Sequence, residues 1–437
     1  MLEKSRYIVE KALKLGAEDV VATTIDSKDM QVRFSNNEID IAKQWREHYA
    51  EIFLSLKKKV VSTEIRNFEK TDEIIERLVK FAKKSKENPE YRGIAQGPFS
   101  YEKHRADKKL LELENPQEYA MQAIQTALEK GCKSTAGMLY LKNQKIFLAT
   151  SKDVEAEDEN TAIELSIRAF YEDDASGHSV SCATKLKDFK PEKAGEEASK
   201  LAKLARNPKQ CEEGEHDMIL SPLFFGSVLS YSVEMTSAFN VLAGLSMYIQ
   251  KLSEKVASDI VNIQDDGSYD ALNVSKFDAE GVPRKKTHII EDGVLKTYLH
   301  NTSTAEKFKT QTTANAGLVQ PSPTNILMKE GDFLREELFS EVRNGLFLTN
   351  TWYTRFQNFQ KGDFSTIPRD AILKIEKGEI TGSLKNIRVS DNMLRLYKNI
   401  EALSKEREQV HWWLETSYPC ITPYVLVRKI KVTKSTE

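Results

Sequence analysis

Cysteine is scarce in this chain, and the few cysteines lie far apart. Four occur in 437 residues, and no two of them form a C-x-x-C pair. This spacing argues against a zinc ribbon, a thioredoxin-like site and a secreted disulfide framework. The first ten residues carry charges every few positions and hold no apolar core, so we expect no signal peptide and a cytoplasmic protein.

An excess of charge of either sign is also missing. The chain has 64 lysines and arginines against 66 aspartates and glutamates, for a net charge of -2. This balance gives no electrostatic reason to expect a nucleic acid or an anionic membrane as partner. The most apolar window, residues 220–249, is interrupted by Pro222, Glu234 and Asn240. It therefore favours a buried helix over a membrane-spanning one.

Several familiar motifs are absent. The chain has no phosphate loop, no dinucleotide glycine fingerprint, no G-x-S-x-G elbow and no EF-hand. Its seven histidines never lie three, four or five residues apart, so no helix carries a two-histidine metal pair. His288 and His300 flank a predicted hairpin with its turn at Asp292-Gly293, which could bring them together as metal ligands. Two ordinary sheet histidines are the simpler interpretation.

What the sequence does contain is alternating helical and strand patterns. Apolar spacing predicts amphipathic helices, and β-branched alternating runs predict strands of a curled antiparallel sheet between residues 19 and 67. The predicted helices cover residues 3–15, 72–84, 117–131, 191–206 and 392–406. Residues 86–115 are predicted to be a linker, 136–150 a hairpin turning at Asn143, and 161–170 a further strand.

These patterns together predict an α+β fold of three domains. An N-terminal helix and curled-sheet domain covers residues 1–110, a central α/β domain covers 111–214, and a strand-rich C-terminal domain covers 215–437. Residues 1–84 and 117–206 each run helix, strands, helix, which indicates an internal repeat.

Seven segments in the C-terminal half, taken in order, resemble segments of a known protein family. They are KLSEKVAS at 251–258, VNIQDDG at 261–267, FDAEGVP at 277–283, IEDGVLKTYL at 290–299, TTANAG at 312–317, GDFS at 362–365 and EKGEI at 376–380. The chain is similar through them to the TldD/PmbA family of peptidase proteins. TldD-type subunits of that family carry His-Glu-x-x-x-His on the helix before the first segment and are thought to add a late cysteine. Such ligands hold Zn²⁺ with one position open, and the Glu takes a proton from bound water.

In this chain the corresponding window carries none of those groups. Leu229, Ser230 and Glu234 stand where the resemblance expects His, Glu and His. Cys420 is the counterpart of the late cysteine, although a small buried hydrophobe is the simpler interpretation of it. One soft ligand does not hold a catalytic zinc, so the resemblance implies a TldE-like subunit without metal, with zinc in a TldD-like partner.

The leading functional hypothesis is a non-catalytic subunit that pairs with a TldD-like peptidase and helps to enclose an unfolded or extended peptide. Tyr353, Arg355, Phe356 and Asp363 are the residues predicted to line the peptide path. Two alternatives stay open. The chain is either a divergent hydrolase with a metal at His288, His300 and Cys420, or a homodimeric binding protein without proteolytic activity.

Overall fold

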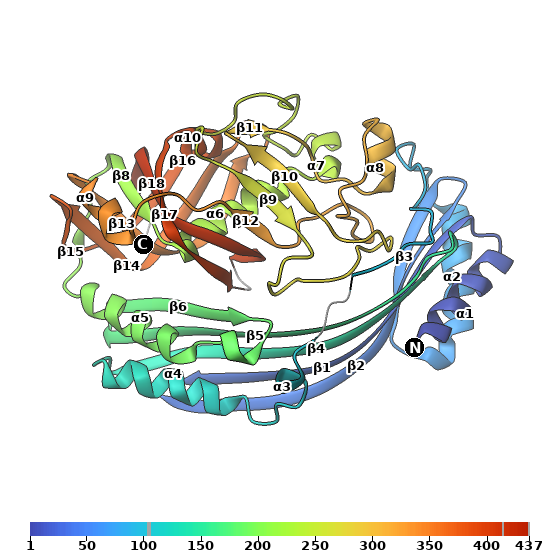
Figure 1. Cartoon of the computed structure of the whole chain (residues 1–437), viewed down its shortest axis with the longest axis horizontal. Coiled ribbons are helices and arrows are strands. Elements are labelled where there is room, and N and C mark those ends of the chain that lie inside the picture. The colour runs from blue at the N-terminus through green and yellow to red at the C-terminus, as the bar shows by residue number, and fades with distance from the viewer. Residues whose placement is uncertain (103–105, 413–414, 436–437) are drawn as a thin grey trace.

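The computed structural model describes residues 1–102, 106–412 and 415–435, and its two sheets are joined by helices and loops (Figure 1). One sheet has six strands and the other twelve, which confirms the predicted α+β class. The six-stranded sheet curves beneath the strand-rich C-terminal part of the chain (Figure 1). Within the described residues, no helix is long and apolar enough to cross a membrane.

The six-stranded sheet consists of long antiparallel strands in the order β3-β2-β1-β4-β5-β6. The strands are β1 (Asp19–Ser35), β2 (Glu38–Leu56), β3 (Lys59–Ile65), β4 (Ser134–Thr150), β5 (Glu155–Glu172) and β6 (Ala175–Ala183). Two-residue turns at Asn36-Asn37 and Lys57-Lys58 join the first three, and all four turn residues have positive φ. Such turns match the right-handed twist of the strands they connect, so they fix the register of both hairpins.

Four helices pack on this sheet in two pairs. They are α1 (Leu2–Lys14), α2 (Thr71–Lys84), α4 (Gln117–Glu129) and α5 (Pro191–Leu204). Each half of the sheet therefore runs helix, three strands, helix, as the predicted repeat requires. The halves meet where β1 pairs antiparallel with β4, from Val21 opposite Thr150 to Ser35 opposite Ala136. Because this central pair is antiparallel, an approximate two-fold axis relates the halves.

The predicted hairpin at Asn143 is wrong. Strand β4 runs through this position without a break, and Asn143 pairs with Lys28 on one side and Thr161 on the other. Its side-chain amide donates a hydrogen bond to the carbonyl of Leu110, which belongs to the short helix α3 (Lys108–Leu111) inside the predicted linker. The neighbouring strands supply hydrogen-bond partners on both edges, and these override the turn preference of asparagine.

The strands of the predicted domains 1–110 and 111–214 thus share one sheet. Whether these segments fold separately, with boundaries at those residues, stays a prediction.

The second sheet belongs to the C-terminal part. Its strands are β7 (Lys209–Gln210), β8 (Gly214–Leu220), β9 (Ile263–Asp266), β10 (Lys286–Glu291), β11 (Val294–Leu295), β12 (Ile326–Met328), β13 (Asn344–Asn358), β14 (Asp363–Glu376), β15 (Glu379–Lys385), β16 (Ile387–Asn392), β17 (Ile400–Trp412) and β18 (Thr416–Lys434).

The long strand β18 lies near the centre of that sheet, between β12 and β8. The helices of this part are α6 (Pro222–Glu234), α7 (Ala238–Leu242), α8 (Thr302–Lys307), α9 (Arg335–Ser340) and α10 (Met393–Lys398). The predicted hairpin at Asp292-Gly293 is confirmed, because β10 and β11 pair across it.

The helix predicted over residues 392–406 is too long. Helix α10 ends at Lys398, and the chain continues as β17, in which Ile400 pairs with Val427 and Leu403 with Val425. The apolar spacing of Met393, Leu396 and Ile400 suits a helix, but the thirteen-residue strand β17 finds a pairing partner in β18. Tertiary pairing therefore decides the conformation after residue 399.

Candidate functional site

Helix α6 is the buried centre of the C-terminal part. Ser221 caps it, since its hydroxyl accepts a hydrogen bond from the Phe224 N–H at 3.2 Å, and Pro222 occupies the first turn. Gly226 lets the helix approach the sheet closely: a Cβ there would lie 2.5 Å from Cγ2 of Val410 and 3.5 Å from Cβ of Cys420. The helix is therefore held directly against β17 and β18.

The window that resembles the metal motif lies in the second half of α6. Leu229 has 0% of its surface exposed and belongs to the main apolar cluster of this part. Ser230 is also buried, and its hydroxyl accepts a hydrogen bond from the Tyr418 backbone N–H at 3.2 Å. Glu234, near the helix end, is half-buried, and this burial raises the pKa of its carboxyl. The window thus serves packing and sheet attachment.

Cys420 lies on β18 next to this helix, so the structure brings the window and the late cysteine together. Its thiol is fully buried and donates weak hydrogen bonds to the carbonyls of Gly226 and Tyr418, both at 3.3 Å. Burial, with the Asp265 carboxyl nearby, raises the pKa of Cys420 strongly. The sulfur is therefore a protonated thiol in the metal-free chain.

The family's zinc does not fit these residues. No imidazole stands at either position of the window, the aliphatic side chain of Leu229 occupies the first, and the Cys420 thiol already has two carbonyl partners. Zinc in proteins requires neutral imidazoles, thiolates or carboxylates arranged as a set. We derive no chemical step through a metal at this place.

The two other metal candidates lie in different surroundings. His288 is exposed on β10, whereas His300 is buried beyond β11 beside Thr304, Tyr298 and Phe308. Burial lowers the pKa of His300 to about 4, so its ring is neutral. Across the described residues, no group of three or more His, Cys, Asp or Glu side chains could hold a metal ion. His288, His300 and Cys420 are therefore not brought together.

The residues predicted to line a peptide path lie along β13 and at the start of β14. Strand β13 has a register irregularity between Trp352 and Arg355, and Tyr353 within it has a φ of 58°. Such a bulge turns a side chain out of the regular alternation. The Tyr353 ring is 48% exposed, and the Arg355 guanidinium lies 5.0 Å from its centre. Phe356 is half-buried, while the Asp363 carboxyl accepts a hydrogen bond from Asn392.

A buried carboxyl supports the bulge from below. Glu415, immediately before β18, accepts hydrogen bonds from the backbone N–H groups of Tyr353 at 2.6 Å and Thr354 at 3.2 Å. Burial raises the pKa of Glu415, although these bonds and the Arg355 charge act in the opposite direction. The bulge is therefore a fixed feature that holds Tyr353 and Arg355 in place.

The bulge and the end of α6 form one electrostatic neighbourhood. Burial raises the pKa of Tyr231, on α6, and the charges of Glu415, Arg355 and Glu234 all act on it. Aromatic, cationic and acidic side chains thus gather beside the degenerate window. We call Tyr231, Glu234, Tyr353, Arg355 and Glu415 the α6 surface. Its groups suit hydrogen bonding and stacking with a peptide.

Sequence reasoning missed Tyr231 and Glu415 as members of this surface. Tyr231 lies inside the window Leu229–Glu234, so its position in the sequence could have indicated it as a site residue. Glu415 belongs to no motif, and only the pairing of β17 with β18 places it under the bulge.

The fold thus combines a curled sheet with a strand-rich part built around a buried helix, and the described residues hold no metal-binding set. Two family models identify it further. A model of the PmbA/TldA metallopeptidase C-terminal domain matches residues 213–434, and one of the central domain matches residues 106–206. The chain belongs to the TldD/PmbA family of metallopeptidases and related proteins.

Individual relatives agree with this membership. A protein named as a metalloprotease from Methanocaldococcus jannaschii is 35% identical over 219 residues, which are 48% of each chain. The chain thus spans about half the length of the curated relatives it matches. The crystal structure of TldE from Thermococcus kodakarensis shares 19% identity, with a TM-score of 0.86 over 98% of this chain and 100% of that one. A Thermotoga maritima structure gives a TM-score of 0.85 at 23% identity over 99% of both chains. These two likenesses show a common fold.

Proposed function

We propose that this chain is a TldE-type subunit that pairs with a TldD-like zinc metallopeptidase and holds an extended peptide for it. The observation that carries the proposal is the state of the α6 window, where Leu229 is packed into the core and Ser230 is bonded to the backbone of β18. The peptidase scaffold is retained while the residues of the zinc motif are replaced.

The α6 surface supports the part of the proposal that concerns the peptide. Tyr353 and Arg355 are exposed, fixed by the Glu415 carboxyl beneath them, and close to the end of α6. An aromatic ring and a guanidinium suit peptide carbonyls and side chains without demanding one sequence. Glu234 adds a half-buried carboxyl at the end of α6, and burial raises its pKa.

The direct test is co-expression with a family subunit that carries His-Glu-x-x-x-His. We expect the two chains to co-elute as a complex that hydrolyses an unstructured peptide, and a chelator to abolish hydrolysis. The purified chain without this partner is expected to be inactive. Chelator-sensitive hydrolysis by the chain alone would overturn the proposal, as would a stable homodimer that never associates with the catalytic subunit.

A paired substitution tests the α6 surface within that complex. Arg355→Ala is expected to raise KM for the peptide several-fold with little change in kcat, because it removes a contact made before and during the reaction alike. Lys377→Ala, in the turn between β14 and β15, removes the same charge away from this surface and is expected to leave KM unchanged. Equal effects of the two variants would contradict the assignment.

A further inference from the structure

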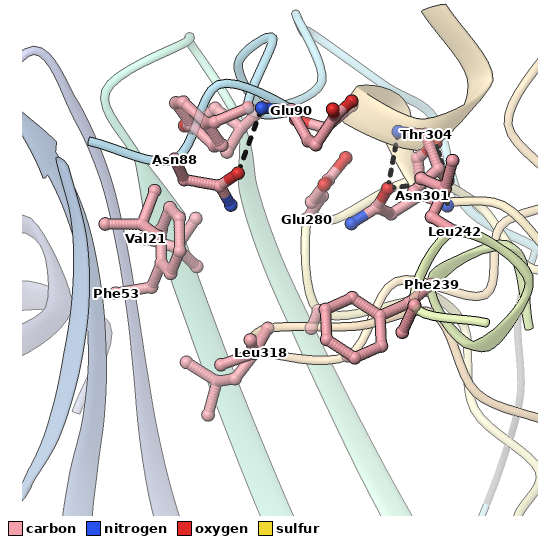
Figure 2. A pocket seen from close by; sticks show the side chains of 18 residues that line it. Val21, Phe53, Asn88, Glu90, Phe239, Leu242, Glu280, Asn301, Thr304 and Leu318 are labelled. Carbon is pink, nitrogen blue, oxygen red and sulfur yellow. Dashed lines mark hydrogen bonds between the residues drawn. The ribbon is translucent and has the colours of Figure 1, made fainter. Parts of the chain in front are cut away.

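A cavity of about 240 Å³ lies between the six-stranded sheet and the C-terminal part. One wall comes from the sheet through Val21 and Phe53, and the opposite wall comes from α7 through Phe239 and Leu242 (Figure 2). Phe239 and Leu242 are 39% and 37% exposed. Large apolar side chains thus remain partly uncovered on one side of the cavity.

Glu280 stands between these two walls (Figure 2). It belongs to a loop of the C-terminal part, in which the Asp278 carboxyl accepts the Glu280 and Val282 N–H groups. Tyr101 donates a hydrogen bond to the Gly281 carbonyl at 2.7 Å and ties the loop to the N-terminal part. Glu280 is therefore held in place by its backbone.

The Glu280 carboxyl is 6% exposed and makes no ion pair with any residue that the structure describes. Its hydrogen-bond partners are neutral donors: the backbone N–H and hydroxyl of Thr302 and the backbone N–H of Ala95. The other carboxyl of the cavity, that of Glu90, is already paired with Lys307. A buried carboxylate is costly without a cation, so Glu280 is the acceptor that the cavity offers to a positively charged ligand.

We propose that this cavity binds a primary ammonium group carried on a compact apolar group, with Glu280 as its counter-ion. The apolar part contacts Phe239, Leu242 and the sheet wall, and the ammonium reaches the carboxylate. The cavity is smaller than the range of about 300–1,000 Å³ that is common for drug-sized ligands, which limits the apolar part to the size of one side chain. This inference is independent of the proposed function, because it concerns the chain alone.

Protonation of Glu280 in the empty cavity predicts that ligand binding depends on pH. Burial and the nearby Asp278 carboxyl raise the pKa of Glu280 to about 8, so the empty site holds a proton at neutral pH. The other ionisable groups facing it are Tyr91 and the Glu90 and Lys307 pair. An entering ammonium replaces that proton, so we expect affinity to rise with pH as long as the alkylamine stays charged, up to about pH 10.

Calorimetric titration of the full chain with isoamylamine tests the proposal, and isoamyl alcohol serves as the neutral analogue. We expect saturable binding of the amine, at least about fivefold tighter at pH 8.5 than at pH 6.5, and much weaker binding of the alcohol. Glu280→Gln should weaken amine binding at least about tenfold, whereas Glu306→Gln, at an exposed position of α8 that does not line the cavity, should leave it unchanged. Phe239→Ser should weaken the binding of both compounds.

Two peptides test whether the bound ammonium is a peptide N-terminus or a small free amine. If Leu-Gly-Gly binds and its N-acetylated form does not, the site takes an apolar N-terminal residue, whereas binding of isoamylamine alone assigns it to small amines. Absence of saturable amine binding at millimolar concentration would overturn the proposal. Equal affinity for amine and alcohol, or an unchanged affinity in a folded Glu280→Gln variant, would do the same.

Discussion

At the scale of single residues, Leu229 and Ser230 show how a site is replaced without damage to its surroundings. Leucine fills core space that an imidazole would not fill well, and serine uses its hydroxyl to bond the Tyr418 backbone on β18. The resemblance in the sequence located both positions. It did not indicate the bond to Tyr418, because that contact joins residues 188 apart in the chain.

Replacing Leu229 with alanine is expected to lower the free energy of unfolding by about 2–5 kcal/mol, because it leaves a cavity in a fully packed core. Leu245→Ala is the matched control, since Leu245 is 45% exposed and its replacement should change stability by less than about 0.5 kcal/mol. Urea unfolding followed by circular dichroism measures both. A similar small loss in the two variants would mean that Leu229 has no packing role.

At the scale of elements, local pattern located the helices on the six-stranded sheet well but underestimated its strands. Helices predicted at residues 72–84 and 191–206 are found at Thr71–Lys84 and Pro191–Leu204. Strand β1 runs on for seventeen residues because neighbours on both sides satisfy its backbone, whatever its side chains prefer. Pairing with distant strands also explains the errors at Asn143 and after α10. Periodicity within a short window carries no information on such partners.

Gly137, on β4, tests how tightly the two halves of the sheet are packed. A Cβ at this position would lie 2.1 Å from the Ser166 carbonyl oxygen and 2.5 Å from Cζ of Phe34. Gly137→Ala is therefore expected to lower the urea midpoint, at a cost of about 1–3 kcal/mol. Gly382→Ala on β15 is the control, because nothing lies within 4 Å of its Cβ. If both variants unfold at the midpoint of the parent chain, the close packing at Gly137 is refuted.

At the scale of the whole molecule, the six-stranded sheet is attached to the C-terminal part near both of its ends. At one end, Gly281 approaches Val154 and Tyr101 bonds its carbonyl. At the other end, Asp370 of β14 binds Arg168 and Ser176 of the sheet. Neither attachment has a sequence signal, because each joins residues far apart in the chain whose meeting depends on the completed fold. The cavity at Glu280 was unforeseen for the same reason.

His178 makes the second attachment sensitive to acid. Its ring is fully buried between Ser166 and Asn350, at 2.8 Å from each, and it packs on Trp412. Burial and the Arg168 charge lower the pKa of His178 to about 4, while Asp370 acts in the opposite direction. An unfolded histidine takes up a proton below pH 6.5, whereas the folded one does so only near pH 4.

The contribution of neutral His178 to the free energy of unfolding is therefore fully present above pH 6.5. It is lost as the pH falls toward 4, and the loss is at most about 3 kcal/mol. Urea unfolding at intervals from pH 7 to pH 4.5 should show this decline. The His178→Gln variant should show a shallower one, with the remaining slope coming from other groups such as buried His300. Parallel slopes in the two proteins would argue against a neutral buried His178, whatever the absolute stability of the variant.

The two attachments of the curved sheet also limit how the molecule can move (Figure 1). A rigid body joined to another at a single place can swing about it, but one joined near both ends cannot rotate without breaking a contact. The Gly281 and Asp370 contacts, together with the ion pairs of Lys276 with Asp158 and of Arg335 with Glu197, restrain rotation of the sheet against the C-terminal part in the described residues. Under the proposed function, an extended peptide therefore reaches the α6 surface through an opening that is already present or that forms when a second chain binds. Access to the α6 surface would then depend on assembly with the proposed partner and not on domain closure.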